Sequence, residues 1–368
     1  MTSCARIFLG LILLMLLDNC SIGPTRIPAD RFDYNEAISK STKEQTLLNL
    51  LRLRYLDVPE VLYVGGVVSQ YNFENSIGIG GTRGFQAGTD SITGTANLNY
   101  AERPTITYSP VSGTEFVSRM LAPLPIELIF SLQHAGWPVD LLLLISLQRI
   151  NGLQNMSFGP LPPLGDVELA QQFQRDMDRL QTFQAMLRNL LEVMDRGVLE
   201  FERNEKDGAL YLVFEEHVPA DVQAAVKRIK STLGLDPRRH KFRITQRVTE
   251  HKPDEITIQP RSVLAIMYFL ARGVEIPISD IQKGRVIPMA SSTEPGIERL
   301  PVPLRVRSQV GRPRDAFVAV PYQGYWFYID SADLESKRVF AVMRYLFLLQ
   351  APAPERGVAP LLTLPAGR

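Results

Sequence analysis

Few residues in this chain could carry out chemistry, and they are not arranged in a recognised catalytic pattern. None of the histidines lies at a spacing that suits a metal site, and the nucleophile and phosphate-loop motifs of known enzyme classes are absent. The acidic pairs Glu215-Glu216 and Asp254-Glu255 fall at the ends of expected strands, where carboxylates are usually solvated. We therefore expect no catalytic residue, no metal site and no cofactor. The four histidines are His134, His217, His240 and His251.

An enzyme remains the competing hypothesis. It would be a soluble periplasmic hydrolase or carbohydrate-active enzyme that uses carboxylates of the C-terminal half of the chain. Such an enzyme needs two carboxyl groups that face each other across a cleft. A sequence alone does not show whether two acids converge in this way, so this alternative stays open here.

The position of Cys20 in the sequence predicts a covalent modification of its side chain. Arg6 precedes an apolar run from Ile7 to Leu17, which is typical of a secretory signal. The run is too short for a membrane-spanning helix, which needs about 20 residues. Cys20 stands where the acylated cysteine of a bacterial lipoprotein would stand, although the two residues before it are poor matches to that signal. An accidental cysteine beside an ordinary signal is the alternative.

This interpretation sets the compartment and the partners. We expect residues 1–20 to be a lipoprotein signal and residues 21–31 a tether, with the lipid on Cys20 inserted in the outer membrane at its periplasmic face. The periplasm itself is the alternative location. Cys4 would leave with the signal, so the folded part would contain no thiol. The expected partners are the outer membrane and other envelope proteins or further copies of the chain.

The charge of the chain does not indicate a nucleic-acid partner. Its 40 Lys and Arg residues balance 39 Asp and Glu residues, for a formal net charge of +1. A local basic run from Arg238 to Arg243 lies between an expected helix and an expected strand, where a solvated turn is the simpler interpretation. No interleaved aromatic residues accompany the run, as they would in a single-strand binding site.

Aromatic residues gather near the C-terminal end. Tyr325, Trp326 and Tyr328 lie in a predicted strand that pairs with residues 316–320 across a turn at 321–324. Because side chains alternate along a strand, Trp326 and Tyr328 share one face and Tyr325 shares the other with Phe327. The exposed set is a candidate surface for glycan or peptide binding. Core packing on both faces is the alternative that the pattern favours.

A long alternating stretch organises the N-terminal half. Between Val67 and Ile79 the odd positions are mostly apolar and the even positions mostly polar or small, and the alternation returns after a Gly-rich connection from Ile92 to Tyr100. A period of two predicts strands, so we expect a long amphipathic β-hairpin. Its arms reach the roughly 9 to 11 residues that a tilted transmembrane strand needs. The candidate membrane-facing or partner-facing residues are Tyr71, Phe73, Ile77, Leu98 and Tyr100.

Two arrangements would cover this apolar face. In the first, several copies of the chain pool their hairpins, because two strands alone leave both edges unpaired in lipid. In the second, which the pattern favours, the face covers the helix that carries Leu47 to Leu53 within a soluble domain. Ser41 and Glu44 form a capping-box pattern that predicts the start of this helix.

The remaining elements predict an α+β fold. The expected architecture is an N-terminal helix with the long hairpin in residues 32–155, followed by a C-terminal domain of mixed helices and antiparallel hairpins in residues 156–368. An apolar stripe between Leu169 and Met194 predicts the longest helix, with Gly197 as its terminator. A last helix is expected from Asp333 to Leu349, capped by Ser331. Helices and hairpins without a regular β-α-β order are typical of α+β proteins.

Four segments carry a resemblance to a known family. They are Arg31 to Tyr34, Arg103 to Pro110, Gly136 to Pro138 and Gly324 to Asp330. Through them nearly the whole mature chain resembles an uncharacterised family of proteobacterial envelope proteins that are described as lipoproteins. The resemblance implies an envelope location and no assigned activity or catalytic residues. The leading hypothesis is thus a non-catalytic envelope lipoprotein that acts as a binding or assembly subunit.

Overall fold

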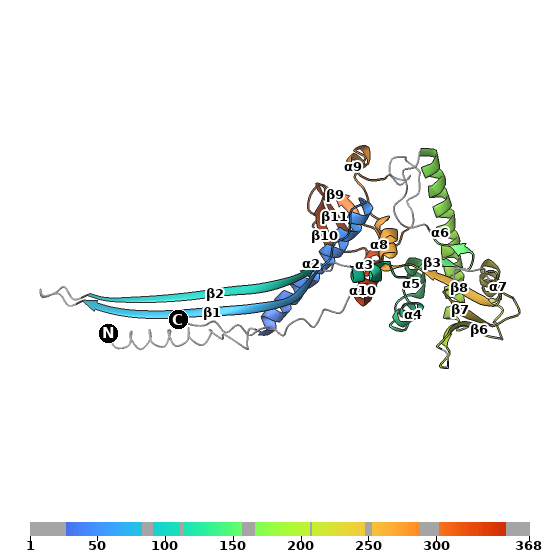
Figure 1. Ribbon diagram of the computed structural model, residues 1–368, viewed down its shortest axis with the longest axis horizontal. Coiled ribbons are helices and arrows are strands. Elements are labelled where there is room, and N and C mark those ends of the chain that lie inside the picture. Colours follow the sequence, from blue (N-terminus) through green and yellow to red (C-terminus); the bar gives the residue numbers. More distant parts are fainter. Residues whose placement is uncertain are drawn as a thin grey trace. The chain divides into compact units, whose positions relative to one another are not determined.

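The computed structural model describes residues 27–82, 91–110, 114–156, 166–206, 208–246, 252–287 and 302–350 (Figure 1). They belong to two compact units, which are described one at a time. Unit 1 holds the described residues of Met1–Pro59 and Thr114–Ala351, and unit 2 those of Glu60–Gly113. Helices and mostly antiparallel strands occur without regular alternation, so the predicted α+β class is confirmed.

Figure 1 shows the arrangement of the helices and strands. The helices are α2 (Ile27–Arg54), α3 (Thr114–Leu121), α4 (Ile126–His134), α5 (Val139–Ser146), α6 (Asp166–Asp195), α7 (Gln223–Thr232), α8 (Val263–Ala271), α9 (Ile278–Gln282) and α10 (Leu334–Gln350). The strands are β1 (Leu62–Thr82), β2 (Ser91–Pro110), β3 (Leu147–Ile150), β4 (Leu153–Gln154), β5 (Leu199–Arg203), β6 (Leu210–Phe214), β7 (Lys241–Thr245), β8 (Glu255–Pro260), β9 (Arg307–Gln309), β10 (Ala316–Tyr322) and β11 (Tyr325–Asp330). None of the described helices is long and apolar enough to cross a membrane.

Unit 2 is a two-stranded antiparallel sheet, as the alternation predicts. Its strands β1 and β2 contain 21 and 20 residues. The register runs from Leu62 opposite Pro110 to Thr82 opposite Ser91, with one irregularity between Val64 and Gly66. At about 3.3 Å per residue, an arm of this length extends roughly 70 Å.

The largest sheet of unit 1 has six strands in the order β4-β3-β8-β7-β6-β5. Strands β7 and β8 are parallel, and the other neighbours are antiparallel. Strand β3 precedes the boundary expected between residues 155 and 156, yet it pairs with β8, which follows that boundary. The two units therefore divide the chain differently from the boundary expected between residues 155 and 156, because backbone hydrogen bonds join the segments before and after it into one sheet.

Helix α2 differs from its prediction at its start. It begins at Ile27, so Ser41 lies in its interior and does not cap it, and residues 27–31 of the expected tether are helical. Its buried leucines are Leu47, Leu50, Leu51 and Leu53. The helix packs against α8 and β10, so these leucines enter the core of unit 1.

The three-stranded sheet of unit 1 has the order β10-β11-β9. The predicted pairing of residues 316–320 with 325–329 is confirmed. Helix α10 follows this sheet and begins at Leu334. Its cap is Asp333, whose carboxylate accepts a hydrogen bond from the backbone N–H of Ser336 at 3.0 Å. Ser331, the predicted cap, lies too far ahead of the first turn for this role.

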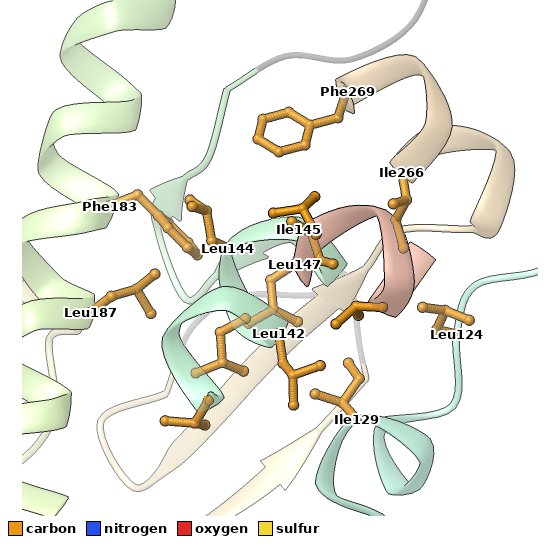
Figure 2. Packing of buried hydrophobic residues seen from close by; sticks show 14 of the residues in the cluster. Leu124, Ile129, Leu142, Leu144, Ile145, Leu147, Phe183, Leu187, Ile266 and Phe269 are labelled. Carbon is orange, nitrogen blue, oxygen red and sulfur yellow. The ribbon is translucent and has the colours of Figure 1, made fainter. Parts of the chain in front are cut away.

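The core of unit 1 is built around α5, whose apolar run lacked a clear helix or strand period (Figure 2). Leu142 and Ile145 are fully buried in this helix. Phe183 and Leu187 reach toward α5 from the long helix α6, and Ile266 and Phe269 belong to α8. The predicted long helix ends as expected, because Gly197 adopts a positive φ of 66° just after it.

Candidate functional site

The hairpin positions chosen from sequence fall in one register. Phe73 stands opposite Tyr100, and Asn75 stands opposite Leu98. Odd positions of β1 thus share a face with even positions of β2, which places Tyr71, Phe73, Ile77, Leu98 and Tyr100 together by register. The side chains of these five residues lie outside what the structure describes. Their contact with lipid or with a partner stays a prediction.

The expected lipid anchor also lies outside the described residues, which begin at Ile27. Most residues of the two acidic pairs are exposed to solvent. Glu215 and Glu216 are exposed after β6, and Asp254 is exposed before β8. Within the described ranges, no group of three or more histidines, cysteines and acids could hold a metal ion.

The aromatic surface divides as strand alternation requires. Phe327 is fully buried, and Tyr325 packs against the core and shares a hydrogen bond of 2.9 Å with the Ser279 hydroxyl. Trp326 and Tyr328 are half-buried on the opposite face of β11. The guanidinium of Arg312 lies 5.4 Å from the centre of the Trp326 ring. Phe327 and Tyr325 thus pack with the core cluster, whereas Trp326 and Tyr328 are not part of it, and glycan or peptide binding by this surface stays a prediction.

A buried ion pair in unit 1 was missed by sequence reasoning. Nη1 of Arg272 lies 3.1 Å from Oδ2 of Asp176, and the two side chains are only 5% and 3% exposed. Asp176 lies on α6, and Arg272 follows the last residue of α8. Burial lowers the pKa of Arg272, and the neighbouring Asp176 carboxylate opposes this effect.

Two further arginines surround this pair. Burial, followed by the charge of Arg272, lowers the pKa of Arg54 to about 10 and that of Arg261 to about 9. Arg261 is 1% exposed. It donates hydrogen bonds to the carbonyls of Leu144, Ile145 and Met156, and its guanidinium stacks 4.2 Å from the Phe269 ring centre. Arg261 thus satisfies carbonyls at the end of α5.

A second polar cluster joins the end of α2 to α9. The hydroxyl of Tyr55 donates to Oδ2 of Asp280 at 2.7 Å, and Nη1 of Arg285 lies 3.0 Å from the other oxygen of this fully buried carboxylate. Burial, followed by the hydrogen bond to Asp280, raises the pKa of Tyr55. The Tyr55 ring meets the Tyr322 ring edge-on, with centroids 5.1 Å apart. This cluster holds the three-stranded sheet region to the helices.

One sequence signal could have indicated the buried ion pair. Asp176 lies three residues after Phe173 and four before Leu180, so it interrupts the apolar stripe of α6. A carboxylate on the apolar face of a helix is almost never buried without a partner. Its partner Arg272 is 96 residues away and carries no local signal.

Comparisons with family models, curated proteins and solved structures found no match to this chain. The resemblance to envelope lipoproteins therefore stays a prediction.

Proposed function

We propose that this protein is a non-catalytic lipoprotein of the bacterial outer membrane that acts as an assembly subunit. Copies of the chain, anchored through Cys20, join their hairpins β1-β2 edge to edge into a shared sheet. The observation that carries the proposal is the two-stranded ladder itself, to which no other described strand is paired.

The physical reason lies in the backbone. A two-stranded hairpin is at best marginally stable in water, and its outer edges present unpaired N–H and C=O groups. Pairing with the hairpin of a second copy satisfies these groups along arms of 21 and 20 residues. In lipid this pairing becomes obligatory, because no water is present to bond the free groups.

The charges along the hairpin support insertion of its turn-proximal half. Glu102 and Arg103 lie near the middle of the ladder, opposite Tyr71 and Gln70. Between them and the turn, residues 72–82 and 91–101 contain a single charged residue, Glu74. These segments match the roughly 9 to 11 residues of a tilted transmembrane strand. The half near Leu62 and Pro110 would then lie outside the hydrocarbon.

The alternative partner for the apolar hairpin face loses support. Sequence suggested that the face covers the leucines of α2. Those leucines instead belong to the core of unit 1, with α2 packed against α8 and β10. The proposal assigns lipid and further copies of the chain as the partners of the hairpin face.

The test is the mass of the full-length protein, extracted in mild detergent and measured by native mass spectrometry. We expect a diacylglyceryl adduct on a defined oligomer. The variant Cys20→Ser removes the adduct and separates anchoring from assembly. An unmodified monomer contradicts the whole proposal and favours a soluble periplasmic protein.

A pair of lysine variants tests which face meets lipid. Phe73→Lys places a charge on the apolar face, where a lysine costs about 2 to 4 kcal/mol near the bilayer midplane. We expect it to reduce both the oligomer and, in the Cys20→Ser background that lacks the lipid anchor, retention in the membrane fraction. Asn72→Lys, the matched control one residue away, adds the same charge to the other face and leaves both unchanged. Equal behaviour of the two variants refutes lipid contact by this face.

A further inference from the structure

Arg54 and Arg272 have the same hydrogen-bonding deficit. Nη1 of Arg272 donates to Asp176, but its Nη2 is buried and has no partner in the part of the chain that the structure describes. Nη1 of Arg54 donates to the carbonyl of Ile287 at 3.2 Å, while its buried Nε likewise lacks a partner among the described residues. A buried N–H that is left unpaired lowers stability, and more so when it belongs to a charged group.

The two arginines lie at the ends of helices that contact each other, and the charge of one acts on the other. Helix α2 ends at Arg54, helix α8 ends immediately before Arg272, and these helices pack against each other. The charge of Arg272 contributes to the lowered pKa of Arg54. Two like charges therefore interact where the Arg272 side chain is buried and Arg54 is half-buried, which is unfavourable unless a negative group balances them.

The described contacts of Arg54 and Arg272 supply one full negative charge. It belongs to Asp176, which also lies 3.9 Å from Arg179. The Ile287 carbonyl that Arg54 binds carries only a partial charge. A second anion at this place would pair with the two buried N–H groups and balance the remaining positive charge.

The backbone beside Arg272 is held in a fixed position. A Cβ built on Gly273 would lie 1.8 Å from the Leu304 carbonyl oxygen, so the two chain segments approach more closely than any side chain allows. The carbonyl of Gly273 accepts a hydrogen bond from the Val306 N–H at 3.0 Å. Arg272 is thus presented from a rigid turn, which lowers the entropy lost when a ligand binds.

We propose that Arg54 and Arg272 together bind an oxyanion, the carboxylate or phosphate group of a small ligand, between the C-terminal ends of α2 and α8. The planar guanidinium presents N–H donors in a geometry that matches the oxygens of both groups. Arg272 contributes Nη2 and Arg54 contributes Nε, so the ligand would bridge two helices that are joined mainly by apolar packing. This binding site is independent of the assembly through the hairpin.

The test uses the full-length protein in mild detergent, titrated with sodium phosphate and, separately, with sodium acetate. Thermal unfolding is followed at each concentration, with sodium chloride at equal ionic strength as the reference. We expect a saturable rise in Tm with phosphate, acetate or both, and the two arms distinguish the phosphate from the carboxylate class. Phosphate also stabilises proteins without binding them. Variants are therefore needed to identify the site.

Arg54→Gln removes the charge, and its side chain ends two atoms short of the Nη1 that binds the Ile287 carbonyl. Arg52→Gln is the matched control, because it removes the same charge two residues earlier on the same helix. We expect the apparent affinity for the oxyanion to fall at least tenfold in Arg54→Gln and to be retained in Arg52→Gln. Unfolding midpoints in chloride alone show whether both variants fold. Should Arg54→Gln fail to fold, Arg54→Lys keeps the charge, lacks Nε, and is expected to lose affinity in the same direction.

Two results overturn the proposal. The first is a Tm of the wild-type protein that does not saturate with either phosphate or acetate. Such a result is expected if a carboxylate of the chain already occupies the site. The second is an equal response of the Arg52 and Arg54 variants, which would assign the effect to general salt action.

Discussion

Gly273→Ala gives the most direct test of the packing that positions Arg272. The added methyl group would lie 1.8 Å from the Leu304 carbonyl oxygen and 2.9 Å from its carbonyl carbon. Both atoms belong to backbone, so relief requires the turn and the 304–306 segment to separate. Such overpacking typically costs about 1 to 3 kcal/mol. Separation also breaks the Val306–Gly273 and Glu275–Val306 backbone hydrogen bonds, each contributing about 1 kcal/mol.

The expected loss in the free energy of unfolding is therefore about 3 to 5 kcal/mol. Urea unfolding followed by far-ultraviolet circular dichroism measures it. Gly152→Ala is the control, since a Cβ at Gly152 meets no atom within 4 Å and its φ is not positive. This control should change stability by no more than about 0.5 kcal/mol. A loss below about 1 kcal/mol in Gly273→Ala would show that the close approach to Leu304 is not a constraint on the fold.

Three further changes test the clusters of unit 1 by the same urea assay. Phe327→Ala empties a fully buried site and should cost about 3 to 5 kcal/mol, whereas Trp326→Ala on the half-buried face should cost about 1 kcal/mol or less; similar losses would contradict the assigned faces of β11. Asp176→Asn leaves its arginine partner buried without a carboxylate and should cost about 3 to 5 kcal/mol; a neutral result would show that the ion pair is solvated. Tyr55→Phe removes the hydrogen bond to the Asp280 carboxylate and should cost about 1.5 to 3 kcal/mol near pH 7. The pKa of Tyr55 is raised in the folded state, so its contribution to the free energy of unfolding is present below about pH 10 and falls as the pH rises above that value. The difference in stability between the wild type and Tyr55→Phe should therefore shrink above about pH 10. A difference that stays constant with pH refutes the raised pKa.

Patterns that repeat along the chain predicted much of the fold. The hairpin of unit 2 follows from a period of two sustained over long arms, and α6 follows from an apolar stripe with a glycine after its end. The hairpin β10-β11 follows from two short alternating runs joined by a turn that ends in Gly324. In each case the pattern of apolar residues is local and repeats several times, so one residue that departs from it does not obscure the prediction.

The start of α2 could not be predicted for a physical reason. Its first half is largely exposed, with Phe32 73% exposed, so the apolar period needed for a helix prediction is missing there. The Ser41-Glu44 pattern then resembled a helix start. In the folded chain these residues lie inside the helix, and the hydroxyl of the adjacent Thr42 donates to the Ile38 carbonyl four residues back. Capping patterns are reliable only where the preceding residues break the helix.

The candidate sites likewise differ in whether their residues are close in sequence. The hairpin positions depend on alternation within one segment, and sequence could group them correctly by register. The arginine and tyrosine clusters depend on contacts between residues 96 to 233 positions apart, such as Tyr55 with Asp280 and Arg54 with Ile287. No periodicity links such residues, and each charged residue alone is typical of a solvated surface.

The two units differ in how their stability arises, and this difference bears on assembly. Unit 1 has a continuous apolar core, whereas the ladder of unit 2 is a single pair of strands. Hydrogen bonds of an isolated ladder contribute little net stability in water, because the unfolded backbone bonds to water instead. Fixing the backbone of the long arms costs about 1 to 2 kcal/mol of conformational entropy for each residue. The contacts within an isolated two-stranded sheet do not offset this cost. The hairpin is therefore the part of the chain whose order depends most on what it joins, and we propose that edge pairing between copies supplies that order.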